Sequence, residues 1–173
     1  MSEVIFLKNI NASNIFGFIN TLNKKPDARA LLNGSHEHPH IRGDVKFHNT
    51  PIGILVVAEV FGLPSDKSSG KNKFFGFHIH EGLNCSGNST DSFADTLGHY
   101  NPQRSEHPYH AGDLPPLFEN SGYAFSAFLT NRFSLSEVIG KTVVIHSMPD
   151  DFTSQPSGMS GKKISCGKIL NFS

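Results

Sequence analysis

The sequence predicts an all-β domain, a β-sandwich or barrel of about eight strands, with a short helical extension at its N-terminus. From Asp27 onward, short apolar or alternating runs are separated by Gly, Pro, Asn, Ser and Asp, which is the pattern of strands joined by turns. Two long stretches, 81–113 and 148–162, lack that pattern, and loops of this length in a compact domain are usually functional or disordered. At 173 residues the chain fits one domain with a normal core.

Residues 1–26 differ in composition and apolar spacing from the rest of the chain and are rich in Asn. Their apolar side chains recur at a spacing that suits a short amphipathic helix: Ile15, Phe16, Phe18, Ile19 and Leu22. Pro26 is expected to end this helix. We therefore divide the chain into an N-terminal extension, 1–26, and a β domain, 27–173.

Seven strands are expected in the β domain, and an eighth is weak. The weak strand, at 114–118, contains Pro115 and Pro116, which cannot donate ladder hydrogen bonds, so it should be very short or lie at an edge. The other seven are expected near 28–32, 40–48, 53–61, 73–80, 122–130, 141–147 and 163–170.

The charge balance excludes some classes of partner. Lys+Arg and Asp+Glu number 15 each, so we expect no nucleic acid and no anionic membrane as a partner. No apolar run approaches the roughly 18 residues that cross a bilayer. The first ten residues lack a basic start, an apolar core and a cleavage site, so we expect a cytoplasmic location and leave export open.

The two cysteines, Cys85 and Cys166, lie 81 positions apart and form no CxxC pair. They are either free buried thiols, the usual state in a cytosolic chain, or the ends of one long-range disulfide. The spacing alone does not decide between the two.

Two predicted strands end in histidines. In Phe77-His78-Ile79-His80 the spacing of two places both imidazoles on one face of the sheet, within reach of one ion. Two exposed histidines on a solvent face would show the same pattern. His146 ends another apolar run, which brings a third ring to the same kind of boundary.

The strongest local signal lies in the first long loop. His99, His107, His110 and Asp113 fall within fifteen residues, and Gly and Pro turns bracket them. Three nitrogens and one carboxylate oxygen suit a tetrahedral Zn²⁺ ion. The alternative is a solvated, histidine-rich loop.

Together these segments resemble the copper/zinc superoxide dismutases, with lysine where most members carry an active-site arginine. The resemblance runs from about residue 39 to 170 and keeps the order of the family's motifs. Five motifs carry it: Gly76-Phe77-His78-Ile79-His80-Glu81, Gly98-His99-Tyr100-Asn101-Pro102, His110-Ala111-Gly112-Asp113, Val143-Val144-Ile145-His146 and Ser165-Cys166-Gly167.

The resemblance implies an eight-stranded Greek-key β-sandwich or barrel with long metal-binding loops, and one copper and one zinc ion per chain. It implies that Asp150 holds a copper ligand and a zinc ligand by their free N–H groups, although a loop aspartate that caps a turn is the plainer interpretation. It also favours a Cys85–Cys166 disulfide. The implied copper ligands are His78, His80, His99 and His146, and the implied zinc ligands are His99, His107, His110 and Asp113.

The implied activity is superoxide dismutation, in which copper alternates between Cu(II) and Cu(I) and His99, as an imidazolate bridge, accepts and returns a proton. Superoxide is then the substrate, and a homodimer is allowed. Two rival hypotheses remain: a copper- and zinc-binding relative without turnover, and a structural zinc-binding domain.

Three features depart from the family. Lys163 stands where most members carry an arginine beside the copper, so we expect reduced rather than abolished activity. Lys162 is expected to add to a positively charged entrance. The alternative is that Lys163 is a solvated lysine at the end of a strand. Only two residues separate His107 from His110, which makes His107 the ligand that depends most on a tight turn. A second cluster, His36, His38 and His40, is expected to be a solvated turn, with adventitious metal binding as the alternative.

Overall fold

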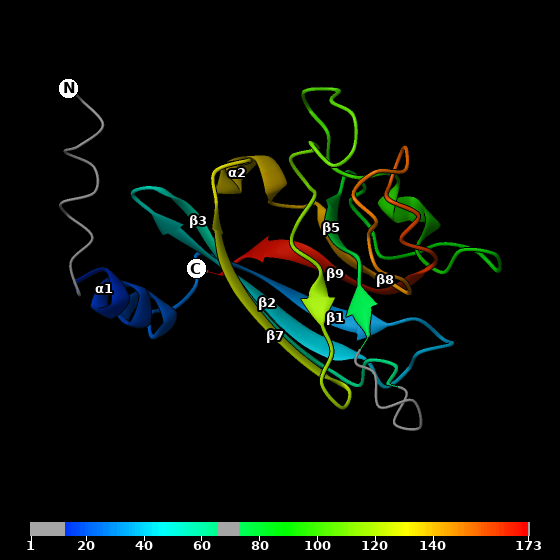
Figure 1. The fold of residues 1–173 in the computed structure, drawn as a ribbon, viewed down its shortest axis with the longest axis horizontal. Coiled ribbons are helices and arrows are strands. Elements are labelled where there is room, and N and C mark those ends of the chain that lie inside the picture. Colours follow the sequence, from blue (N-terminus) through cyan, green and yellow to red (C-terminus); the bar gives the residue numbers. More distant parts are fainter. Residues whose placement is uncertain (1–12, 66–72, 173) are drawn as a thin grey trace.

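The computed structural model describes residues 13–65 and 73–172 (Figure 1). Nine strands make up most of it, with little helix. The strands are β1 (Ala28–Gly34), β2 (Arg42–Thr50), β3 (Gly53–Phe61), β4 (Phe74–Phe75), β5 (Phe77–His80), β6 (Leu117–Phe118), β7 (Tyr123–Thr130), β8 (Thr142–His146) and β9 (Lys163–Asn171). The helices are α1 (Ser13–Leu22), α2 (Leu135–Val138) and the 3₁₀ turn η2 (Ala94–Thr96).

Seven strands form one curled antiparallel sheet, in the order β5-β8-β9-β1-β2-β3-β7, and β4 pairs with β6 separately. The sheet curls into a half-barrel (Figure 1), which confirms the predicted all-β class. After β3, and again after β7, the chain passes from one edge of the sheet to the opposite edge, as in Greek-key connections.

The single strand expected at 73–80 is wrong, because the chain changes partner at Gly76. β4 pairs with β6, whereas β5 pairs with β8. A Cβ atom on Gly76 would lie 2.8 Å from Cβ of Ser160, so only glycine allows this close crossing. The expected weak strand is present as β6, which is two residues long, as its prolines required.

The core fills the inside of the curled sheet. Alternate residues of β1 are buried and accessible along the strand, as the pleat requires for a half-buried strand. The largest fully buried apolar side chains are Phe47, Phe75, Phe77, Leu32, Ile41, Ile79, Leu117, Ile145, Ile164 and Ile169. Each stabilises the fold by roughly 1.5–3 kcal/mol through the apolar surface that it removes from water.

The predicted N-terminal helix is present as α1, where the structure describes it. It ends at Leu22, four residues before Pro26, and Phe18 and Ile19 on it are exposed. Residues 1–12 of the predicted extension lie outside the described residues, and the boundary at residue 26 stays a prediction. No helix among the described residues is long and apolar enough to cross a membrane.

The long loops gather beside β5 and β8 at one end of the half-barrel (Figure 1). One of them is tied to β9 by a disulfide between Cys85 and Cys166, so the bridge favoured by the resemblance is confirmed. Phe93 and Val144 pack against the two cysteines. The disulfide and this small apolar cluster therefore fix the loop against the sheet.

Candidate metal centre

β5 and β8 bring three histidines to one end of the sheet. His78 and His80 lie on β5, and His146 is the last residue of β8. The loop that follows runs back beside β5, since His99 forms an isolated β-bridge with His80 and Asp113 forms one with His78. Residues 99–113 are thus placed against the strand that carries the first histidine pair.

The structure brings the four implied copper ligands together. One potential ligand atom from each of them lies within 4.8 Å of the others, and all four side chains are buried. The rings of His78 and His99 lie with centroids 3.9 Å apart. The set comprises His78, His80, His99 and His146.

The four implied zinc ligands form a second buried group within the same 4.8 Å limit. His99 belongs to both groups. Its Nδ1 lies 2.7 Å from Oδ1 of Asp113, on the zinc side, which leaves Nε2 for the copper side. The group comprises His99, His107, His110 and Asp113.

Unpaired ring nitrogens show that these residues fit two ions. Five buried side-chain nitrogens among the described residues have no hydrogen-bond partner; one is His48 Nε2, outside the ligand groups, and the other four belong to them: His78 Nδ1, His99 Nε2, His107 Nδ1 and His110 Nδ1. An unsatisfied buried polar group of this kind costs about 1–3 kcal/mol, and metal ligation is what relieves it. The protein therefore holds nitrogens ready for ligation on both sides of His99.

The copper-side nitrogens of His80 and His146 are set by what their other nitrogens contact. His80 Nδ1 donates to the carbonyl of Leu97 at 2.9 Å, and His146 Nδ1 donates to that of Gly161 at 3.3 Å. Both Nε2 atoms then lack a proton, and they face each other at 3.1 Å. Two lone pairs so close are favourable only around a cation, which supports the four-histidine set.

Asp150 connects the two groups. Its Oδ2 accepts from His78 Nε2 and its Oδ1 from His107 Nε2, both at 2.8 Å. Oδ1 also accepts the N–H of Phe152 at 2.7 Å, so the turn-capping interpretation holds as well. Gly158, with φ +69°, packs so closely on this carboxylate that any Cβ atom there would collide with it.

Burial keeps the copper-side rings neutral. It lowers the pKa of His78 to about 4 and that of His146 to about 3, and lowers the pKa of His80 well below its ordinary value. Burial alone would raise the pKa of Asp113, but hydrogen bonding from His99 and the neighbouring rings lower it below the ordinary value. At neutral pH these three rings are therefore neutral and Asp113 is ionised, which are the protonation states that bind metal.

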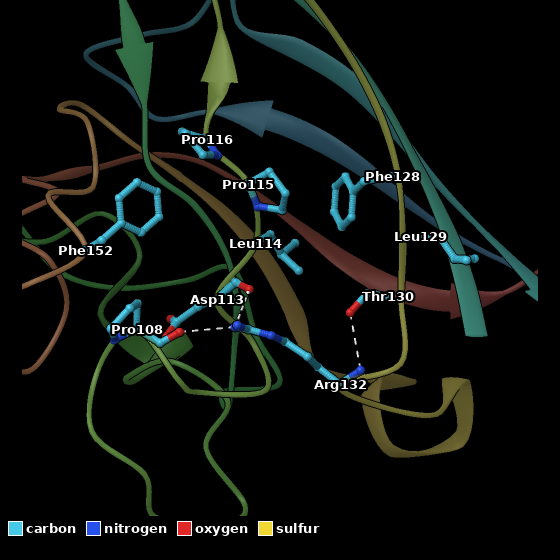
Figure 2. A pocket seen from close by; sticks show the side chains of 10 residues that line it. All are labelled: Pro108, Asp113, Leu114, Pro115, Pro116, Phe128, Leu129, Thr130, Arg132 and Phe152. Atoms are coloured by element: carbon cyan, nitrogen blue, oxygen red, sulfur yellow. Dashed lines mark hydrogen bonds between the residues drawn. The ribbon is translucent and has the colours of Figure 1, made fainter. Parts of the chain in front are cut away.

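The zinc loop is held by two residues that the sequence analysis missed. Arg132, just after β7, donates from Nη1 to the carbonyls of Pro108, His110 and Asp113 at 3.1–3.3 Å. Figure 2 shows this guanidinium beside Pro108 and Asp113, at the rim of an apolar pocket. No local pattern marks an arginine for such a role.

Gln155 supports the shortened turn at His107. Its side chain accepts from the N–H of His107 at 3.0 Å and donates to the carbonyl of the same residue at 2.8 Å. This pair of bonds to one backbone unit places His107 in the zinc group despite the two-residue spacing to His110. Like Arg132, Gln155 carries no signal in the sequence.

Lys163 is not free. Its Nζ donates to Oδ2 of Asp91 at 3.0 Å and to the carbonyl of Phe93 at 3.1 Å, and its side chain is only 14% exposed. Lys162 is 75% exposed and lies 4.0 Å from Glu37. The two lysines expected to give a positive entrance therefore each have a carboxylate beside them.

The second histidine cluster lies in a turn at the surface. His36 and His40 are exposed and His38 is half-buried. Among residues 13–65 and 73–172, the groups of three or more side chains that could hold one ion do not include any of the three. Backbone hydrogen bonds from His38 to Ser35 and from Ile41 to His38 close this segment as a turn, as expected.

A curled antiparallel half-barrel with two buried ligand groups that share one imidazole defines a binuclear metalloprotein. The family model described as copper/zinc superoxide dismutase matches residues 41–169. The chain belongs to the copper/zinc superoxide dismutase family.

Individual relatives agree with this assignment. The chain is 33% identical over 151 residues to a copper/zinc superoxide dismutase of Legionella pneumophila, covering 83% of this chain and 86% of the relative. It is 32% identical over 142 residues to superoxide dismutase 2 of Aquifex aeolicus, covering 73% and 78%. A crystal structure of a superoxide dismutase-like protein from Bacillus subtilis matches with a TM-score of 0.68 at 26% identity, covering 82% of this chain and 97% of that one.

Proposed function

We propose that the protein converts two superoxide anions and two protons into O₂ and H₂O₂. The observation that carries the proposal is the completeness of the two ligand groups and their shared His99. Copper, when bound, supplies the one-electron chemistry by alternating between Cu(II) and Cu(I). The remaining work falls to the chain's own side chains.

His99 is the residue that we propose handles a proton. Its Nδ1 lies on the zinc side with Asp113, and its Nε2, on the opposite side of the ring, has no protein partner. Nε2 can therefore accept a proton and give it up again while Nδ1 stays committed to the zinc group. His99 itself is buried, with 7% of its surface exposed.

Asp150 and Asp113 orient the rings for this chemistry. Asp150 fixes His78 and His107 from outside the site, and Asp113 fixes His99 from within it. Rings held in this way keep their bare nitrogens aimed at the ions without reorganisation.

We further propose that Lys163 is the residue that favours anion entry, in the place of the family's arginine. It is the first residue of β9 and pairs with His146 of the copper group in the sheet register. An ammonium keeps the charge of a guanidinium but lacks its planar fork, so Lys163→Arg should raise the rate and Lys163→Met should lower it.

The alternative is a family member that binds both metals without significant turnover. The lysine in place of arginine favours it, as does the likeness to a solved structure titled superoxide dismutase-like. The complete four-histidine group weighs against it, because a relative without turnover would be free to lose copper ligands.

One experiment separates these functions. The protein is purified with both metals, its copper and zinc are measured per chain, and superoxide removal is followed for the wild type and for His146→Ala. The proposal expects one copper and one zinc per chain in the wild type and a loss of most activity in the variant. Equal rates for the two copper-loaded proteins would contradict it and support the alternative.

A further inference from the structure

We propose that Asp91 neutralises Lys163 and thereby sets how strongly the copper site attracts small anions. This inference rests on the proposed function of the site. It assigns a role to a loop carboxylate that belongs to neither ligand group.

The contact between the two side chains is direct. Asp91 Oδ2 lies 3.0 Å from the ammonium nitrogen, and the carbonyl of Phe93 accepts a second hydrogen bond from it at 3.1 Å. The lysine side chain is 14% exposed and the aspartate side chain 36% exposed. The charge that would draw an anion is therefore largely enclosed by its partners.

Asp91 is itself held in place. Its Oδ1 accepts the N–H of Phe93 at 2.9 Å, and its own N–H donates to the side chain of Asn88 at 3.0 Å. The disulfide of Cys85 and the burial of Phe93 fix the same loop against the sheet. The ion pair therefore does not depend on a chance rotamer of a flexible loop.

The neighbouring lysine does not replace the lost charge. Lys162 lies 4.0 Å from Glu37, and both side chains are well exposed. An exposed pair of this kind is screened by solvent and salt, so it contributes little in either direction. The field at this edge of the site is thus governed by the closer pair, Lys163 and Asp91.

A paired charge acts on an incoming anion far less than a single one. The attraction of a lone ammonium falls with the inverse of distance, whereas an adjacent carboxylate cancels most of it. We therefore expect that Asp91 lowers the affinity of the site for small anions and weakens the dependence of anion capture on ionic strength.

The test uses azide as the anion and the copper- and zinc-loaded protein. Asp91→Asn removes the charge and keeps one oxygen acceptor, which can still accept the N–H of Phe93. Azide binding is followed by the visible absorption of the bound copper at several salt concentrations. The expected result is azide binding that is roughly 2- to 16-fold tighter at low salt, which is the range that one unit charge about 10 Å away produces at effective dielectric constants from about 80 down to about 20.

Asp95→Asn is the matched control. Asp95 lies in the same loop and carries the same charge, but its carboxylate accepts from Ser86 rather than from Lys163. The control should leave the azide constant within a factor of two of the wild type. The double variant Asp91→Asn/Lys163→Met should lose the gain, because the freed ammonium is then absent.

The outcomes separate this inference from the proposed function. Azide binding requires bound copper but no turnover, so a copper-loaded wild type that removes no superoxide overturns the proposed function and leaves this titration readable. Equal azide constants for Asp91→Asn and Asp95→Asn overturn the inference. Weaker azide binding by Asp91→Asn also overturns it, since Asp91 would then support Lys163 rather than neutralise it. Asp91→Ser, which keeps an acceptor for Phe93, repeats the test if the asparagine variant folds poorly.

Discussion

The carboxylate of Asp150 joins His78 to His107, accepting one hydrogen bond of 2.8 Å from the Nε2 atom of each ring. One ring belongs to the copper group and the other to the zinc group. A single side chain thus orients one ligand of each metal group, and a change at Asp150 should alter the affinity for both metals.

Asp150→Asn should weaken the binding of both metals, each by roughly 10- to 100-fold, because the rings lose a charged acceptor that fixes their orientation. Chelator competition on the purified protein measures both affinities. Asp151→Asn is the control, since that carboxylate only caps its own turn through Thr153 and Ser154. Loss of one metal with the other unchanged would contradict the account.

Arg132→Ala should weaken zinc binding about tenfold and leave copper binding nearly unchanged. The guanidinium holds three carbonyls of the segment that carries His110 and Asp113, and without it that segment is held by fewer contacts. Zinc affinity and the visible spectrum of cobalt in the zinc site report the change. Arg42→Ala is the control, because Arg42 binds only the carbonyls of Pro39 and Ile41 in its own turn. An unchanged zinc affinity would show that Arg132 does not position the loop.

Replacing both cysteines, Cys85→Ser with Cys166→Ser, should lower the free energy of unfolding of the metal-free protein by roughly 4–5 kcal/mol. This is the value that the chain-entropy model gives for a crosslink between residues 81 positions apart. Denaturant unfolding under oxidising conditions measures it, and reduction of the wild type should give the same shift. A change of less than about 1 kcal/mol would mean that the loop is held by other contacts.

The metal-free protein should lose stability between pH 7 and pH 5. The pKa of His78 is about 4 and that of His146 about 3 in the folded protein, against about 6.5 in the unfolded chain. The unfolded chain therefore binds more protons in this range, and stability falls as the pH falls. Each ring accounts for about 2 kcal/mol at pH 5.

Denaturant unfolding of the chelator-treated protein at several pH values measures this slope. His78→Gln should reduce the slope, whereas replacing the exposed His36 by Gln should leave it unchanged. A free energy of unfolding that is flat from pH 7 to pH 5 would contradict the assigned burial of these rings.

Much of the site follows from local sequence. The spacing of two in His78 and His80 places both rings on one face of a strand because the pleat has a period of two. The strand at 53–61 has the predicted bounds because it is a nearly continuous apolar run that turn residues bracket, which is also a local pattern. The change of partner at Gly76 could not be predicted, because it depends on which strands lie on either side of β4 and β5.

The supporting contacts were beyond prediction for a different reason. Lys163 and Asp91 are 72 positions apart, and Gln155 and His107 are 48 apart. Such pairs form only once the loops have taken their paths across the end of the half-barrel, and no residue pattern describes those paths. For a lysine at the end of a strand, or an aspartate or glutamine in a loop, the sequence does not show whether the side chain is solvated or hydrogen-bonded to another part of the chain.

The most direct test of the shared site is the number of metal ions that each ligand variant holds. The metal-free wild type and three variants, His146→Ala, His110→Ala and His99→Ala, are titrated with copper and zinc, and bound ions are counted by native mass spectrometry. The account predicts one copper and one zinc in the wild type, a weakened copper site alone in His146→Ala and a weakened zinc site alone in His110→Ala. His99→Ala should weaken both sites, and full retention of either ion by that variant would contradict a bridge at His99.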